Sequence, residues 1–247
     1  MLLWDQPAES WRKWGERDPY YAVLSTEPRF RQSQITPSDR LAFYESGTES
    51  IRAILDHVAT QHPALNKGRA LDFGCGAGRL VVPLAREFEE AVGIDIAPRM
   101  RSLSLAYAAE SGLENVSVAA DVDEVEGDFD FIHSLMVFQH IPWRTGLGIM
   151  SKLLGRIAPG GVAALQVPLA DLAGPARRYV SMMRRFTPIN AITNIARGRA
   201  WDEPLMRMYR YDVNAVSVMA RQQGFDTLRL WSFDNPRFPY AYLLFFR

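Results

Sequence analysis

The sequence predicts an α/β protein in which a mostly parallel, doubly wound β-sheet is covered by helices on both faces. Between residues 69 and 167, short apolar runs alternate with longer amphipathic segments, and this alternation is typical of repeated β-α-β units. A glycine-rich segment follows the first apolar run, where a strand would turn sharply into a helix. The composition is that of an ordinary globular protein, with 247 residues, 48% hydrophobic and 23% charged.

Charge and cysteine content exclude several classes of protein. Lysine plus arginine and aspartate plus glutamate balance at 28 each, so no long-range field draws in nucleic acid, and we expect no nucleic-acid partner. Cys75 is the single cysteine, which excludes an internal disulfide and a multi-cysteine zinc site. With no signal-peptide pattern and no long apolar run, the sequence predicts a cytoplasmic protein without a membrane span; peripheral membrane contact and the oligomeric state stay open.

The elements of the core follow one another in a regular order. Apolar residues at Ile51, Ile54, Leu55 and Val58 share one helix face, so a helix over residues 47–62 leads into the first strand. Strands are predicted at residues 69–73, 91–95, 116–119, 129–134 and 161–167, and helices at 78–88, 98–111 and 144–157. A last helix at 212–223 and two closing strands at 228–233 and 240–247 complete the pattern.

We divide the chain into four parts of one structural domain. Residues 1–46 mix aromatic residues, prolines and charges, and we expect an N-terminal helical cap there. Residues 47–168 form the core, which residues 212–247 complete. Residues 169–211 interrupt the alternation with eight arginines against three acids, and we expect a helical insertion. Its amphipathic part, residues 175–186, is either a lid over the site or a solvated surface helix.

The glycine-rich segment carries the first candidate binding residues. Gly74, Gly76 and Gly78 alternate between a strand and a helix, where they permit a sharp turn and close approach of a ligand. The spacing differs from the dinucleotide fingerprint G-x-G-x-x-G, which requires a glycine where Arg79 stands. Asp72 would repel a pyrophosphate but attract a cationic group. The segment therefore favours a ligand with a cationic amino acid portion over a diphosphate.

Two further acids follow the next two strands. Asp95 ends the second strand, about twenty residues beyond the glycine segment, where a carboxylate can accept hydrogen bonds from ribose hydroxyls. Asp121 follows the third strand and can accept a hydrogen bond from the adenine amine, while Val122 offers its backbone N–H. Asp121 also begins an acidic run, so a solvated loop is the competing interpretation.

These motifs resemble those of the class I S-adenosylmethionine-dependent methyltransferases. The resemblance covers residues 68–168 and rests on five segments in the family's order: 71–78, 93–100, Asp121, 129–134 and 154–161. It implies a seven-stranded sheet with an antiparallel last strand and S-adenosyl-L-methionine as cofactor. It also implies the following contacts: Asp72, Gly74, Gly76, Gly78 and Ser134 near the methionine part, Asp95 at the ribose, and Ile96, Met100, Asp121 and Val122 around adenine.

The acceptor side is predicted from the residues after the fourth strand. In the resembling enzymes this stretch lines the mouth of the cofactor pocket, and His140 stands in it. An imidazole accepts protons near neutral pH, so His140 is the candidate general base, with packing as the competing interpretation. Trp143, Tyr209 and Tyr211 are the candidate substrate contacts. We expect methylation of a small molecule at oxygen, with a sugar or glycan precursor as the favoured acceptor.

Several alternatives stay open at this stage. Metal-assisted O-methylation needs converging carboxylates, and Asp121, Asp123 and Asp128 could imitate such a set, although they lie near the adenine end. Methylation of nitrogen or carbon in another metabolite is the nearest functional alternative. The more distant ones are an NAD-dependent oxidoreductase and a non-catalytic module that only binds the cofactor.

Overall fold

The computed structural model describes residues 4, 6–170, 174–233 and 239–247. These residues form a seven-stranded sheet in the order β3-β2-β1-β4-β5-β7-β6. The strands are β1 (Arg69–Phe73), β2 (Glu90–Ile94), β3 (Val116–Ala119), β4 (Phe129–Ser134), β5 (Ile157–Pro168), β6 (Leu228–Phe233) and β7 (Tyr240–Phe246). Strands β1 to β5 pair in parallel, and β7 pairs antiparallel with both β5 and β6. The predicted doubly wound fold class, with its antiparallel last strand, is confirmed.

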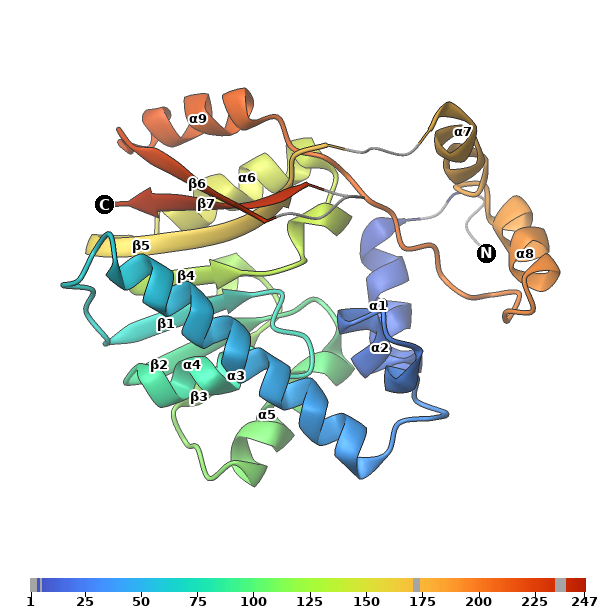
Figure 1. Cartoon of the computed structure of the whole chain (residues 1–247), viewed down its shortest axis with the longest axis horizontal. Helices are drawn as coiled ribbons and strands as arrows, with labels where there is room; N and C mark the ends of the chain where they lie inside the picture. The colour runs from blue at the N-terminus through green and yellow to red at the C-terminus, as the bar shows by residue number, and fades with distance from the viewer. Residues whose placement is uncertain (1–3, 5, 171–173, 234–238) are drawn as a thin grey trace.

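Helices cover both faces of the sheet (Figure 1). On one face lie α3 (Pro37–Ala59), α4 (Val81–Glu87) and α5 (Pro98–Glu110), and on the other lie α6 (Trp143–Leu154) and α9 (Val213–Gln222). Each face has its own apolar core, one built on Ile54 and Leu84 and the other on Leu153 and Val216. A parallel sheet needs this double cover because both of its faces are apolar.

Helix α3 begins ten residues earlier than the predicted helix, at Pro37. Its start is fixed by a capping box, in which the Thr36 side chain accepts from the backbone N–H of Asp39 and the Asp39 carboxylate accepts from that of Thr36. Such a box with proline at the first position is a strong helix start. The prediction missed it because the preceding residues show no helical periodicity.

The N-terminal cap consists of α1 (Pro7–Arg17), α2 (Pro19–Val23) and the 3₁₀ turn η1 (Pro28–Phe30). Figure 1 shows α1 and α2 beside the carboxyl ends of the parallel strands. The approach is close: a Cβ added to Gly15 of α1 would lie 2.7 Å from Ala97 Cβ, and one added to Gly76 would lie 2.8 Å from Val23 of α2. The cap therefore packs directly on the loops that follow β1 and β2.

The insertion after β5 forms two short helices, α7 (Pro175–Met183) and α8 (Thr187–Ala196), which stand away from the sheet at one end of the molecule (Figure 1). A backbone bridge between Trp4 and Phe186 joins it to the start of the described chain. Two further 3₁₀ turns, η2 (Val122–Glu124) and η3 (Phe138–His140), follow β3 and β4. Among the described residues, no helix is long and apolar enough to cross a membrane.

Candidate active site

The glycine loop after β1 is held by backbone geometry. Gly74, Gly76 and Gly78 all have positive φ, at 81°, 54° and 91°, a region that residues with a side chain rarely adopt. The N–H groups of Gly74 and Cys75 both donate to the carbonyl oxygen of Ile94, at 2.7 and 2.9 Å. The loop is therefore bent back across the end of β2, where its backbone can lie close to a ligand.

Asp95, at the end of β2, is tied to this loop. One carboxylate oxygen accepts from Gly76 N–H at 3.0 Å and the other from Ala97 N–H at 2.8 Å. Burial raises the pKa of Asp95 to about 6, although these two hydrogen bonds and nearby Arg101 favour the charged form. Each oxygen keeps a second lone pair, so the carboxylate can accept two further hydrogen bonds. These two acceptor positions fit the two hydroxyls of a ribose, which would donate to them.

The adenine residues implied by the sequence lie along the same edge of the sheet. Ile96 exposes its apolar side chain just after Asp95, while Met100 is buried against the cap. Asp121 is exposed and accepts from the backbone N–H of Asp123 at 3.0 Å, and the Val122 side chain is buried. Ile96 and Asp121 are thus the members of this group whose side chains are open to a ligand.

Asp72 lies beneath the loop rather than on its surface. Its carboxylate is fully buried and accepts from Nδ1 of His133 at 3.3 Å, and Nε2 of His133 lies 2.9 Å from the hydroxyl of Tyr242. We refer to Asp72, His133 and Tyr242 as the buried polar chain. Its members come from β1, β4 and β7, so it crosses the sheet. The Asp72 carboxylate is therefore not exposed at the surface of the site, and its place near a cationic ligand stays a prediction.

Ser134 has a similar internal role. Its side chain is fully buried and its hydroxyl donates to the carbonyl oxygen of Phe73 at 2.9 Å. This bond holds the end of β4 against the end of β1. Ser134 is therefore buried within the sheet, and its hydroxyl hydrogen is donated to Phe73.

His140 ends the turn η3 and has a partner on each ring nitrogen. Nδ1 lies 2.6 Å from the carbonyl oxygen of Arg207, and Nε2 lies 2.9 Å from the amide nitrogen of Gln139. These partners assign the proton to Nδ1, which donates to Arg207, and leave the lone pair on Nε2. Burial lowers the pKa of His140 to about 4, so the ring is neutral at pH 7. The indole of Trp11 packs on it, with ring centroids 4.5 Å apart.

The three candidate substrate residues lie around η3, but they differ in accessibility. Trp143 starts α6 and is exposed, and Tyr209 is half-buried with its hydroxyl accepting from Arg207 at 3.2 Å. Tyr211 is 2% exposed, and its hydroxyl donates to Ile141 O at 3.1 Å. Its phenol also fills the space above Gly146. Tyr211 therefore packs within the protein and is not open to a substrate.

Sequence reasoning missed residues that the structure brings to the same place. Trp11 comes from the cap and Arg207 from the segment before α9, and both contact His140. Met136, just after β4, has a φ of 64° and donates its N–H to Gln166 at 3.0 Å. A residue with a side chain in this conformation is uncommon and stores about 1 kcal/mol of strain. None of these residues belongs to a motif, so no signal in the sequence marked them.

The acidic run considered as a metal site has other partners. Asp123 pairs with Lys152 of α6, and Asp121 accepts from the Asp123 backbone. Across residues 4, 6–170, 174–233 and 239–247, no group of three or more His, Cys, Asp or Glu gathers as a metal site would require. Asp121 and Asp123 are therefore engaged in a hydrogen bond within their turn and in an ion pair with α6.

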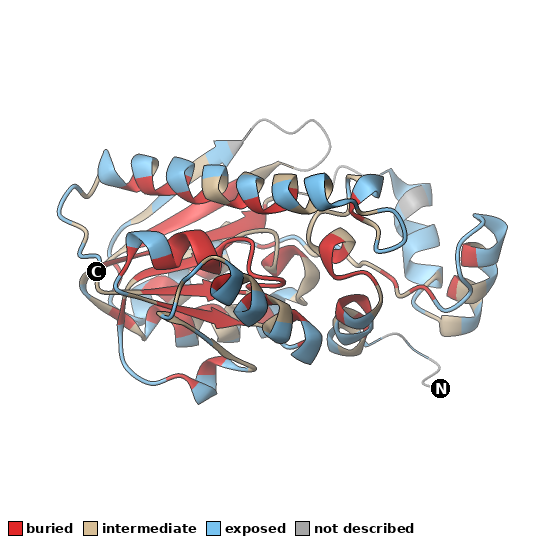
Figure 2. Cartoon of the chain, turned by 90° about the horizontal axis from the view of Figure 1, so that it is seen from below, coloured by how far each residue is buried: buried red, intermediate tan, exposed pale blue. Residues whose placement is uncertain are grey.

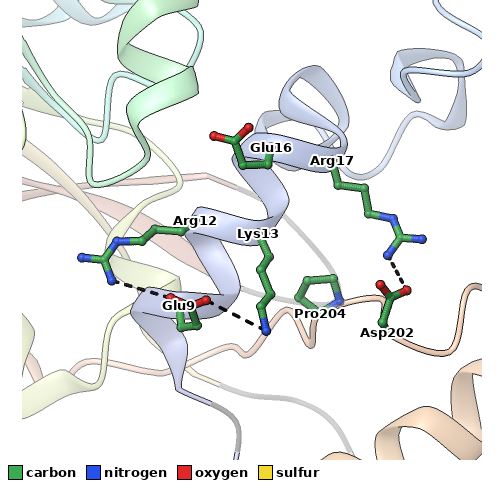
Figure 3. Close-up of a pocket in the computed structure, with 7 residues that line it drawn as sticks. All are labelled: Glu9, Arg12, Lys13, Glu16, Arg17, Asp202 and Pro204. Carbon is green, nitrogen blue, oxygen red and sulfur yellow. Dashed lines mark hydrogen bonds and ion pairs between the residues drawn. The ribbon is translucent and has the colours of Figure 1, made fainter. Parts of the chain in front are cut away.

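A hollow of about 500 Å³ lies on the outer side of α1 (Figure 3). Arg12 and Lys13 lie 3.8 and 4.0 Å from Glu9, and Arg17 pairs with Asp202 at 2.8 Å. Its charges thus largely neutralise one another, and its walls come from α1 and the segment Asp202 to Pro204. The hollow joins the cap to the insertion and shares no residue with the glycine loop or η3.

A family model described as a methyltransferase domain matches residues 45–230. This range includes the glycine loop, Asp95, η3 and the insertion. The match covers about three quarters of the chain, including most of the sheet.

Curated relatives resemble part of the chain. A trans-aconitate 2-methyltransferase from Deinococcus radiodurans is 34% identical over 103 residues, 40% of this chain and 38% of the relative. A ubiquinone biosynthesis O-methyltransferase from Nitrosococcus oceani is 35% identical over 104 residues, 40% of this chain and 43% of the relative. The chain therefore spans less than half the length of these two relatives.

One solved structure resembles the whole chain. The magnesium protoporphyrin IX methyltransferase from Synechocystis, solved with bound S-adenosylmethionine, superposes with a TM-score of 0.63 and covers 100% of both chains. The sequence identity is 14%, so this likeness concerns the fold. It includes the cap and the insertion as well as the sheet.

Proposed function

The chain belongs to the methyltransferase-domain family, and from this premise we propose that it is an S-adenosylmethionine-dependent enzyme that methylates an acidic oxygen of a small molecule. The observation that carries the choice of acceptor is the environment of His140, an imidazole held through Nδ1 by the Arg207 carbonyl oxygen and packed beside the Trp11 indole, whose burial lowers its pKa. The relatives named for trans-aconitate and for O-methylation in ubiquinone biosynthesis are consistent with an oxygen acceptor.

The donor half of the proposed site consists of the glycine loop and the residues after β2 and β3. Asp95 accepts the ribose hydroxyls on the lone pairs that Gly76 and Ala97 leave open. Ile96 packs on adenine, and Asp121 accepts from its amine. When bound, S-adenosylmethionine supplies an electrophilic methyl group. The protein's contribution is to hold the acceptor oxygen in line with it.

The acceptor half surrounds Nε2 of His140. We assign this nitrogen as the site that takes the acceptor's proton, for which the Gln139 amide must give up its bond to Nε2. A base with so low a pKa suits a phenol, with a pKa of about 10, better than a sugar hydroxyl at about 16. A carboxylate needs no base at all. The sugar acceptor favoured by the sequence is therefore the less suitable class, and it serves as a comparison in the test.

Three neighbouring side chains can hold such an acceptor. Trp11 offers an aromatic face beside His140, and Arg207 and Tyr209 lie on the opposite segment, joined to η3 by the bond from Tyr209 N–H to Gln139 O at 2.7 Å. An aromatic face together with a guanidinium group favours a planar or anionic acceptor.

The acceptor is identified by incubating the chain with methyl-labelled donor and a matched panel, followed by mass analysis. The panel contains small carboxylic acids, phenols and sugars. We expect label on a carboxyl or phenolic oxygen. Label only on a sugar hydroxyl would refute the acidic acceptor, and label only on nitrogen or carbon would refute O-methylation.

The donor is tested separately by thermal unfolding. S-adenosylhomocysteine should raise the melting temperature and NAD should not, because a ligand stabilises only the state that binds it. Stabilisation by NAD alone would contradict the proposed donor site, whatever the acceptor panel shows.

A further inference from the structure

Helix α8 is amphipathic in the reverse sense to an ordinary surface helix. Its buried residues are polar: the side-chain amides of Asn190 and Asn194 both donate to the carbonyl oxygen of Glu203, at 3.0 and 2.8 Å. Their amide oxygens accept from Arg184. Its outer residues are apolar, with Ile192 68% and Ile195 63% exposed. A helix that turns its polar side inward presents an apolar side to a partner.

Helix α7 adds a second apolar surface. Ala176, Tyr179, Val180 and Met183 follow the spacing of one helix face. None of the described residues of α7 is buried, and Tyr179 is 60% exposed. Figure 2 shows the exposed colour over most of this end of the molecule. Within the described part of the chain, the apolar face of α7 is therefore not buried in a core.

The charge around these two helices is mainly positive. Residues 169–211 contain eight arginines against the three acids Asp171, Asp202 and Glu203. Two of these acids are paired with arginines, Asp202 with Arg17 and Glu203 with Arg31 and Arg199. Eight positive and three negative side chains give this part of the chain a net charge of +5, although the whole chain is neutral.

We propose that α7 and α8 dock on a lipid bilayer that contains anionic phospholipid. Amphipathic helices with basic and aromatic residues lie in the headgroup region, where apolar side chains enter the acyl boundary and arginines meet phosphates. The two helices stand away from the sheet at one end of the molecule (Figure 1), so a flat fluid surface can reach both at once. The apolar side chains that enter are Tyr179, Val180, Met182, Met183, Ile192 and Ile195.

Vesicle sedimentation with the full chain tests this docking without reference to methyl transfer. The probes are vesicles of phosphatidylcholine alone and vesicles that also contain about 30% phosphatidylglycerol. We expect at least about tenfold stronger partitioning to the anionic vesicles. Raising the salt from about 0.1 to about 0.5 M should release the protein, because salt screens the arginine–phosphate attraction.

Two variants separate the apolar and the charged contributions. Ile192→Ser with Ile195→Ser should lower partitioning about tenfold or more, because both side chains would leave the acyl boundary. Arg185→Gln with Arg197→Gln should lower it about 25-fold, at about fivefold for each arginine near an anionic surface. The matched control is Val218→Ser on α9, where the side chain is 59% exposed far from the insertion, and it should partition as the parent does.

The outcomes are distinct. Circular dichroism first establishes that each variant is folded, which the exposure of these positions favours. Equal binding to both kinds of vesicle, or no binding to either, overturns the proposal. The proposal is also overturned if the parent protein binds no vesicles but self-associates, and if Ile192→Ser with Ile195→Ser abolishes that self-association. A second copy of the chain would then be the occupant of the apolar surface.

Discussion

The two halves of the proposed site are built in different ways. The donor half is held by hydrogen bonds from backbone N–H groups of the glycine loop to the end of the adjacent strand, from Gly74 to the Ile94 carbonyl oxygen and from Gly76 to the Asp95 carboxylate. The acceptor half is assembled from segments distant in sequence, with the Trp11 indole and the backbone carbonyl group of Arg207 meeting at the His140 imidazole. The first is fixed by local conformation and the second by tertiary packing. A change in each half should therefore have a different consequence.

The largest expected effect is on the donor half, from Gly74→Ala. The positive φ of Gly74 strains any side chain, and the new Cβ would lie 2.2 Å from Val137 Cγ2. We expect the free energy of unfolding to fall by about 3 kcal/mol, as the sum of backbone strain and overpacking. Denaturant unfolding measures it.

Gly112→Ala is the matched control for this change. Gly112 has a φ of 70°, but a Cβ there would meet nothing within 4 Å. Its cost should be about 1 kcal/mol, from backbone strain alone. If the two variants are equally stable, packing against Val137 does not stabilise the glycine loop.

The next effect belongs to the acceptor half, from His140→Asn. The asparagine amide can replace Nδ1–H as donor to Arg207 but offers no base. With a phenolic acceptor, which needs a base, we expect kcat to fall about 100-fold, within the usual contribution of a general base, while the dissociation constant of S-adenosylhomocysteine stays unchanged. Single-turnover kinetics and calorimetry measure the two quantities. Full activity in this variant would assign His140 a packing role only.

Asp95→Ala, unlike His140→Asn, should act on cofactor binding. It removes a charged acceptor of ribose hydrogen bonds, and we expect cofactor binding to weaken by about 2 kcal/mol, with a smaller loss for the exposed Asp121→Ala. Calorimetric titration with S-adenosylhomocysteine measures both. If Asp121→Ala weakens binding more than Asp95→Ala does, the ribose assignment is wrong.

The smallest effect is a pH dependence that His140 adds to stability. Its folded pKa of about 4 lies below the unfolded value near 6.5, so the unfolded chain binds more protons between these values. Stability from this group is present above about pH 6.5 and is lost as the pH falls towards 4. Asp95, with its raised pKa, has the opposite dependence over about pH 4–6.

Comparison with His140→Asn isolates the histidine contribution. Between pH 7 and 4 the parent should lose about 1.5 kcal/mol relative to the variant, after allowance for partial exposure of the ring. Urea unfolding at several pH values measures this difference. A difference that does not vary with pH would mean that the folded His140 titrates normally.

The same contrast explains what the sequence could predict. The order of the strands and the glycine loop after β1 follow from local patterns. Some bounds differ: β5 begins at Ile157, four residues before the predicted start, and β2 ends at Ile94, so that Asp95 directly follows the strand. The contact between Trp11 and His140 depends on how α1 packs over the sheet, which no local pattern records. The sequence also does not predict that α8 buries its polar side, because this depends on the hydrogen bonds from Asn190 and Asn194 to the carbonyl oxygen of Glu203.

The start of α3 is a different case, because its signal was present. Thr36 and Asp39 have the spacing of a capping box, with Pro37 at the first helical position. The apolar periodicity that defines the rest of the helix begins later, so a prediction based on periodicity alone starts too late.

The buried polar chain connects Tyr242 of β7, through His133, to Asp72 of β1, just before the glycine loop. Tyr242 reaches His133 across β5, where Ala164 occupies the intervening strand beside His133. Removing the phenol hydroxyl would leave an imidazole nitrogen without a partner in a dry interior, at a cost of about 1–3 kcal/mol. That loss would weaken the hydrogen-bonded support of Asp72, which lies under the glycine loop. A substitution at Tyr242 in β7 should therefore disturb the glycine loop after β1, although the two segments lie far apart in the sequence.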